Sequence, residues 1–155
     1  MLSRKTSAKI SLGICIASSA ALAVLLVCFP RFFSWFYMDY HRIPEATEAV
    51  TRIFRIVVTS FYLCAPFAAA ALYMLIRLLK NLLDDRVFIH TNVVYLRGIS
   101  WCCYAVFLVT FAGGFLYVPL FIIAFATGVV GTLLRVVKNV MHAAEELREE
   151  NDLTI

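Results

Sequence analysis

Three runs of this sequence contain no charged residue: residues 10–29, 56–76 and 98–134. The hydrocarbon core of a bilayer is about 30 Å thick, and an apolar helix of about 20 residues crosses it with its backbone hydrogen-bonded internally. The last run is long enough for two crossings, because a single helix of that length would span about 55 Å. The sequence therefore predicts an all-α polytopic membrane protein, a single domain built as a four-transmembrane-helix bundle.

The composition agrees with this interpretation. Hydrophobic residues make up 63% of the chain and charged residues 15%, whereas soluble domains average about 45–50% and 25%. The net charge of +4 is a weak signal for nucleic-acid binding, and the basic residues are better explained as topology signals. We therefore expect the lipid bilayer as a partner and no direct contact with nucleic acid.

The distribution of Lys and Arg predicts the topology. Ten of these residues lie in the N-terminal tail, the middle loop and the C-terminal tail: Arg4, Lys5, Lys9, Arg77, Lys80, Arg86, Arg97, Arg135, Lys138 and Arg148. The loop after the first crossing holds the other four: Arg31, Arg42, Arg52 and Arg55. Because basic residues favour the cytoplasmic side, we expect both termini in the cytoplasm. The Ala21-Leu22-Ala23 triplet resembles a signal-peptide cleavage site, but the apolar run continues to Phe29, so we expect an uncleaved anchor.

The predicted elements are four crossings, two loops and a tail. The crossings are placed at about residues 10–29, 56–76, 96–114 and 119–137, with an outer aromatic loop at 30–55, a cytoplasmic loop at 77–95 and an acidic cytoplasmic tail at 138–155.

Local signals set the helix ends. Gly113-Gly114 is expected to end the third crossing, and Pro119 suits the first turn of the fourth. Thr91 or Asn92 could cap the third helix.

The outer loop is rich in aromatic residues, namely Phe32, Phe33, Trp35, Phe36, Tyr37 and Tyr40. Aromatic rings favour the headgroup region, so we interpret them as an interfacial belt followed by a helix that starts at Pro44. A ligand-binding lid is the alternative.

The charge-free runs at 10–29, 56–76 and 98–134, which form the apolar cores of the four crossings, contain no His either. Ion-coupled transporters usually place an ionisable group there, so active transport is disfavoured. A passive pore lined by hydroxyl groups is the alternative. The residues that could line it are Ser18, Ser19, Thr59, Ser60, Thr110, Thr127 and Thr132.

Small residues recur four apart, at Ala65 and Ala69 and along the set Ala124, Gly128 and Thr132. This spacing predicts close helix packing within one chain, or a self-association surface on the fourth helix that would make a homo-oligomer.

No catalytic, metal or cofactor site is predicted. Asp84, Asp85 and His90 share the middle loop, and His142 and Glu145 are three apart on one face of a predicted helix, but neither set is complete enough for a reaction or a metal. We expect Asp84-Asp85 to end the second helix in a turn. The five cysteines, Cys15, Cys28, Cys64, Cys102 and Cys103, form no metal-binding motif and are interpreted as small apolar packers. We therefore expect a protein that is not an enzyme.

Two segments carry a family resemblance. Residues 81–88, with 92–97 and Ile99, resemble the middle signature of a bacterial four-helix integral membrane family, domain of unknown function 2975, and residues 146–155 resemble its acidic C-terminus. Family members tend to have a Gly near Asp85 and a hydroxyl residue near Ile89, which this chain lacks. The resemblance implies a bacterial cytoplasmic membrane protein without an assigned activity, often encoded beside a small helix-turn-helix regulator of the Cro type.

That association suggests that the protein is a membrane partner that binds a cytoplasmic helix-turn-helix regulator through its tail. Acidic residues there could compete with DNA phosphates for a regulator's basic surface, and two apolar residues could anchor it. The predicted partner-binding residues are Glu145, Glu146, Glu149, Glu150, Asp152, Leu153 and Ile155. A solvated helix end without a partner is the simpler interpretation of the tail. The alternative function is a small passive pore, exporter or immunity-type membrane protein.

Overall fold

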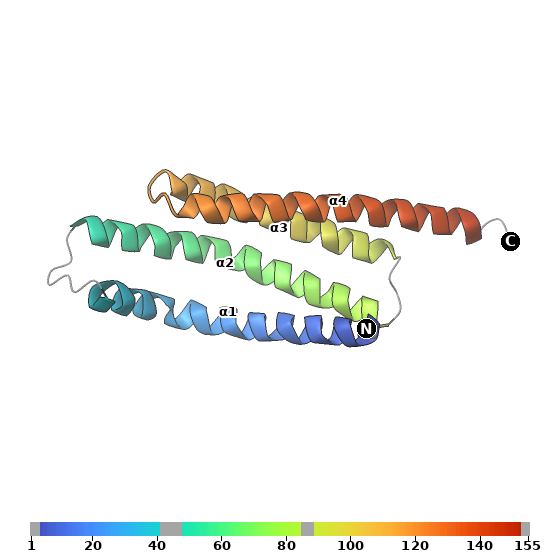
Figure 1. Cartoon of the computed structure of the whole chain (residues 1–155), viewed down its shortest axis with the longest axis horizontal. Helices are drawn as coiled ribbons and strands as arrows, with labels where there is room; N and C mark the ends of the chain where they lie inside the picture. Colours follow the sequence, from blue (N-terminus) through green and yellow to red (C-terminus); the bar gives the residue numbers. More distant parts are fainter. Residues whose placement is uncertain (1–3, 41–47, 85–88, 153–155) are drawn as a thin grey trace.

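The computed structural model describes residues 4–40, 48–84 and 89–152, which form four helices (Figure 1). They are α1 (Arg4–Tyr40), α2 (Glu48–Leu83), α3 (His90–Gly114) and α4 (Leu120–Asp152), and the described residues contain no strand. Each helix contains a segment long and apolar enough to cross a membrane. The predicted all-α, four-helix membrane fold is confirmed. Consecutive helices run antiparallel, so α1 begins and α4 ends at the same end of the molecule (Figure 1).

Helix α1 is longer than predicted. It passes through Pro30 and ends at Tyr40, so the predicted loop boundary at residue 30 is wrong. A helix tolerates one proline at the cost of a backbone hydrogen bond, and the aromatic run contains no further helix breaker. Phe32 and Trp35 are therefore exposed on the surface of a helix rather than in a loop. The predicted helix start at Pro44 lies outside the described residues.

The turn between α3 and α4 follows the prediction closely. Helix α3 ends at Gly114, and the Gly113 carbonyl accepts the N–H groups of Leu116 and Tyr117 at 3.0 and 2.9 Å. A Cβ on Gly113 would lie 2.7 Å from Cδ1 of Leu120 and 3.1 Å from Oγ of Ser60, so side chains of α4 and α2 pack closely against this glycine. Pro119 immediately precedes α4 rather than occupying its first turn.

The link between α2 and α3 differs in its cap. As predicted, α2 ends just before Asp84, whose N–H donates to the Lys80 carbonyl at 3.1 Å in a turn. The predicted cap of α3 is wrong, because Ile89 is the N-cap and makes no side-chain capping bond. Asn92 lies inside the helix and is fully buried.

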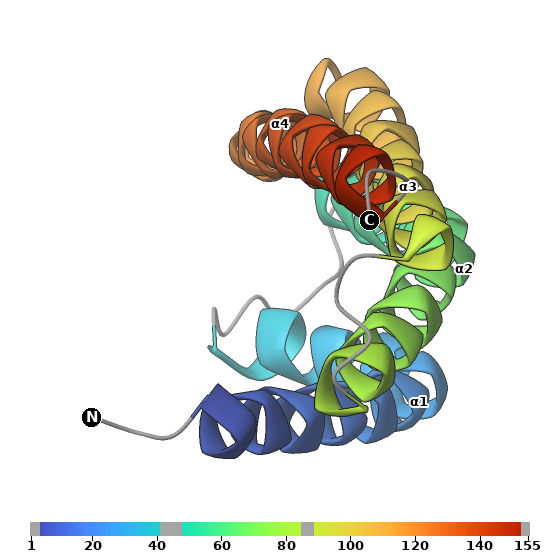
Figure 2. The ribbon, with the colours of Figure 1, turned by 90° about the vertical axis from the view of Figure 1, so that its right-hand side faces the viewer.

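The helices form an open, curved row, as the end-on view shows (Figure 2). Among the described residues, α1 packs against α2, α2 against α3 and α3 against α4, with no packing between α1 and α4. The contacts between α1 and α2 include a hydrogen bond from the Tyr62 hydroxyl to the Leu26 carbonyl at 2.7 Å and the stacked rings of Phe29 and Phe61 at 4.0 Å.

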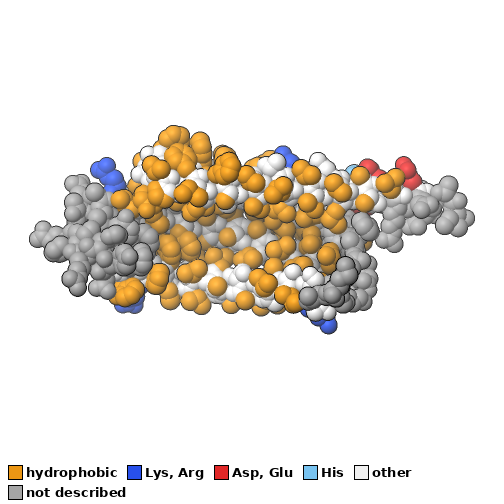
Figure 3. All heavy atoms as spheres, viewed as in Figure 1, with side chains coloured by type: hydrophobic (Ala, Val, Ile, Leu, Met, Phe, Trp, Pro, Cys, Tyr) orange, Lys and Arg blue, Asp and Glu red, His pale blue; other side chains and the backbone are white. Residues whose placement is uncertain are grey.

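Much of the exposed surface of the row is apolar. Hydrophobic side chains cover the face seen in Figure 3 along most of its length. Val27, Ile122 and Phe125 are 80%, 74% and 75% exposed, and soluble proteins rarely leave so much apolar surface in water. The protein is therefore a multi-pass membrane protein.

The small residues of α4 pack within the chain. Ala124 is buried, Gly128 lies against the Phe107 ring, and Thr132 shares a 3.2 Å hydrogen bond with Tyr104. This face is thus used by α3, as the close-packing interpretation expects. Ala65 is buried but Ala69 is exposed, so that pair does not form one contact face.

Candidate functional site

The α3–α4 hairpin has one continuous register from its turn to its open end. Gly113 faces Leu120 near the turn, the Ser100 hydroxyl donates to the Gly131 carbonyl at 2.9 Å in the middle, and His90 faces Glu145 at the end. His90 is the first residue of α3, so the part of α4 after Glu145 extends beyond α3. Figure 1 shows this part of α4 projecting past the other helices.

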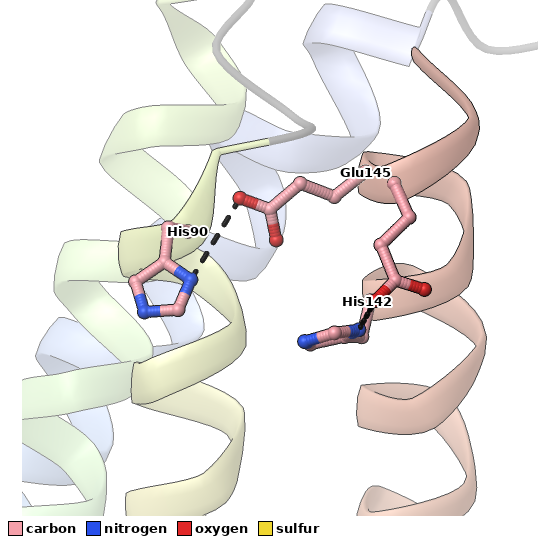
Figure 4. Close-up of polar contacts among 4 residues, drawn as sticks. His90, His142 and Glu145 are labelled. Carbon is pink, nitrogen blue, oxygen red and sulfur yellow. Dashed lines mark ion pairs between the residues drawn. The ribbon is translucent and has the colours of Figure 1, made fainter. Parts of the chain in front are cut away.

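Glu145 joins α4 to the start of α3. Its Oε1 lies 3.8 Å from Nδ1 of His90, and Figure 4 shows its side chain reaching across toward that ring. The Glu145 side chain is 10% exposed and that of His90 is 75% exposed. A carboxylate beside the first turn of a helix is stabilised by the positive end of the helix dipole. This contact places the last part of α4 against the first residue of α3.

His142 pairs with the next acidic residue. Its Nδ1 lies 3.3 Å from Oε1 of Glu146, one turn further along α4. The sequence suggested His142 with Glu145, three positions apart, but Glu145 points to α3 instead (Figure 4). Within the described part of the chain, no group of three or more His, Cys, Asp or Glu side chains could hold a metal ion. Asp84 is exposed at the end of α2, and Asp85 lies outside the described residues.

A hydrogen-bonded amide pair, of which Asn92 is buried and Asn81 partly exposed, joins α2 to α3 near the same end of the molecule. Nδ2 of Asn81 donates to Oδ1 of Asn92 at 2.8 Å, and Asn92 is completely buried. Val93 and Leu96 of α3 and Leu78 of α2 form the apolar core around this level. The sequence did not predict this pair. Its one signal was that both asparagines lie in segments that carry the family resemblance.

A known family model covers most of this chain. A family model described as "Protein of unknown function (DUF2975)" matches residues 10–155, which includes all of the hairpin and the acidic end. The chain belongs to the DUF2975 family. No curated protein and no solved structure matches it.

In this DUF2975 member the predicted tail divides into two parts. Glu145 is buried against α3, whereas Glu146 and Glu150 are exposed on the projecting part of α4. Glu149 and Asp152 lie on the same part of α4, and Leu153 and Ile155 lie outside the described residues. The exposed acidic surface thus begins at Glu146. A partner role for the tail stays a prediction.

Proposed function

We propose that this DUF2975 protein is a non-enzymatic partner in the bacterial cytoplasmic membrane, which binds a helix-turn-helix regulator through the projecting end of α4. The observation that carries the proposal is that α4 continues for more than a turn beyond Glu145, which contacts the first residue of α3. The carboxylates of Glu146 and Glu150 are exposed there, and Leu147 between them is 67% exposed. An acidic helix end with one apolar residue suits a basic protein surface.

The proposal needs the α4 end to face the cytoplasm. The basic residues favour that side, and the fold adds a further argument. Arg77 and Arg97 lie at about one level, because Asn81 pairs with Asn92 and Gly98 lies against Met74. Arg135 lies at that level too, since Ser100 bonds to Gly131. Three arginines at the end that holds both termini support a cytoplasmic orientation.

The hydroxyl-lined pore receives less support. The hydroxyls of Ser19, Thr110, Thr127 and Thr132 each donate to the carbonyl four residues earlier in their own helix, at 2.7 to 2.9 Å. A hydroxyl that donates its hydrogen bond to its own helix backbone has no hydrogen left to donate to a permeating solute. This pattern is typical of serine and threonine in membrane helices.

Co-purification from native membranes tests the proposal. A chain ending at Glu145 keeps the contact with His90 and removes the projecting segment, so its membrane level should equal that of the full chain. We expect a cytoplasmic DNA-binding protein to co-purify with the full chain alone. Its recovery should fall as salt rises, because contacts between exposed charges are screened.

A matched charge substitution sharpens this test. The double variant E146K/E150K should lose the partner, whereas D84K, at the exposed end of α2, should retain it. Equal recovery of the partner with the full chain and with E146K/E150K would refute binding through the tail. We would then measure solute flux across reconstituted bilayers.

A further inference from the structure

A groove of about 420 Å³ lies between α3 and α4. Tyr104 and Phe107 of α3 and Phe125, Gly128, Val129 and Thr132 of α4 are among the residues that line it. The hydroxyls of Tyr104 and Thr132 share a hydrogen bond of 3.2 Å, and the Thr132 hydroxyl also donates to the Gly128 carbonyl. The groove therefore presents carbon atoms to its occupant, with no unused hydroxyl.

The positively charged side chain of Arg135 lies at one end of this groove. The guanidinium carbon of Arg135 lies 5.3 Å from the Trp101 ring centroid and 5.4 Å from that of Tyr104, which also lines the groove. No carboxylate pairs with Arg135 in the part of the chain that the structure describes. Two aromatic contacts hold the guanidinium in place and leave its N–H donors available to an anion.

Arg135 lies at the depth in the membrane where the lipid headgroups begin. It lies about 22 Å along α4 from Leu120, and the turn before Leu120 is itself apolar. In a hydrocarbon core of about 30 Å, a long side chain at this position reaches the far interface. Helical spacing places Arg97 one turn from Trp101, and Lys138 one turn from Arg135. The mouth of the groove is therefore positively charged at headgroup level.

We propose that this groove binds one acyl chain of an anionic phospholipid, and that Arg135 binds the phosphate of the same lipid. The bidentate guanidinium suits a phosphate, and the neighbouring basic residues favour a headgroup with net negative charge. A second copy of the chain fits less well. The sequence has no Asp or Glu in residues 1–38, 49–83 or 86–144, so the spans of a second copy offer no carboxylate at this depth.

The fluorescence of Trp101 reports directly on this site. The chain has two tryptophans, so W35F leaves Trp101 as the single emitter. The variant is reconstituted in phosphatidylcholine vesicles that contain a minor fraction of either brominated phosphatidylglycerol or brominated phosphatidylcholine. We expect the anionic quencher to associate about fivefold more strongly, the ratio for one basic residue at a membrane surface.

Two matched pairs of variants, made in the W35F chain, separate this site from general attraction to the membrane. R135Q should remove the preference for the anionic lipid. R77Q should keep it, although Arg77 also lies over a tyrosine ring, at 5.4 Å from Tyr73. V129F, which fills the groove from an exposed position, should reduce quenching by both lipids, and V130F on the neighbouring exposed residue should not.

Three results would overturn the proposal. Equal quenching by the two lipids would show no headgroup selection. Equal effects of R135Q and R77Q would show only diffuse attraction. Protection of Trp101 from both quenchers would show that protein, such as a second copy of this chain, covers the groove instead of lipid.

Discussion

The carboxylate of Glu145 lies 3.8 Å from the His90 imidazole and is almost entirely shielded by the helices around it. One residue belongs to the last part of α4 and the other begins α3, so the contact closes the open end of the α3–α4 hairpin. It also marks the point beyond which α4 continues without α3 beside it.

Replacing Glu145 with lysine should loosen the start of α3. E145K puts a cation in a buried position beside the positive end of a helix, which we expect to cost about 1–2 kcal/mol locally. The backbone amides in the first turn of α3 should then exchange hydrogen about tenfold faster in lipid nanodiscs. E146K is the control, because the Glu146 side chain is 63% exposed. Similar exchange in the two variants would mean that Glu145 does not hold this end.

The side chains of Asn81 and Asn92 should be coupled in their contributions to the free energy of unfolding. N92A removes a fully buried acceptor from Asn81 and should lower the free energy of unfolding by about 1–3 kcal/mol. In a double-mutant cycle, N81A and N92A should show a coupling of about 1 kcal/mol. Unfolding in mixed micelles of increasing denaturing detergent measures each variant. Additive single effects would contradict a direct interaction.

Gly131 should be intolerant of a side chain. A Cβ added at Gly131 would lie 3.2 Å from the Cys103 Cβ and 3.5 Å from the Ser100 carbonyl oxygen. G131L should therefore force α3 and α4 apart and lower the free energy of unfolding by about 1–3 kcal/mol. Nothing lies within 4 Å of a Cβ at Gly13, so G13L should leave stability unchanged. We expect G128L to have a smaller effect than G131L, because its nearest neighbour is the movable Phe107 ring at 3.2 Å. Thermal aggregation in detergent ranks the three, and a G13L protein as unstable as G131L would argue against this packing.

The proposed orientation can be tested at the two ends of α4. After the five native cysteines are changed to alanine, V118C lies in the outer turn and L147C on the projecting end, and both positions are well exposed, at 73% and 67%. A membrane-impermeant maleimide should label V118C in intact cells, and L147C only after the cells are broken. Labelling in the opposite order would place the acidic end outside the cell.

Features that depend on residues close together in the sequence were predictable from the sequence. Four crossings follow from the length of the apolar runs, because lipid offers no hydrogen bonds to an open backbone. The turn at Gly113-Gly114 and the end of α2 before Asp84 follow from local backbone preferences. The course of α1 through Pro30 was missed because the aromatic run itself continues the helix.

The tertiary structure decided which distant residues meet. His90, His142 and Glu145 stood out in the sequence, but their partners depend on the register of α3 against α4, which is set by close contacts such as Ser100 with Gly131. The burial of Glu145 and the position of Arg135 against the Trp101 and Tyr104 rings also depend on this register, and the Asn81–Asn92 pair depends on that of α2 against α3. Local preference and hydrophobicity determine helices and their length in the membrane, whereas side-chain packing between helices determines how they slide and rotate against each other.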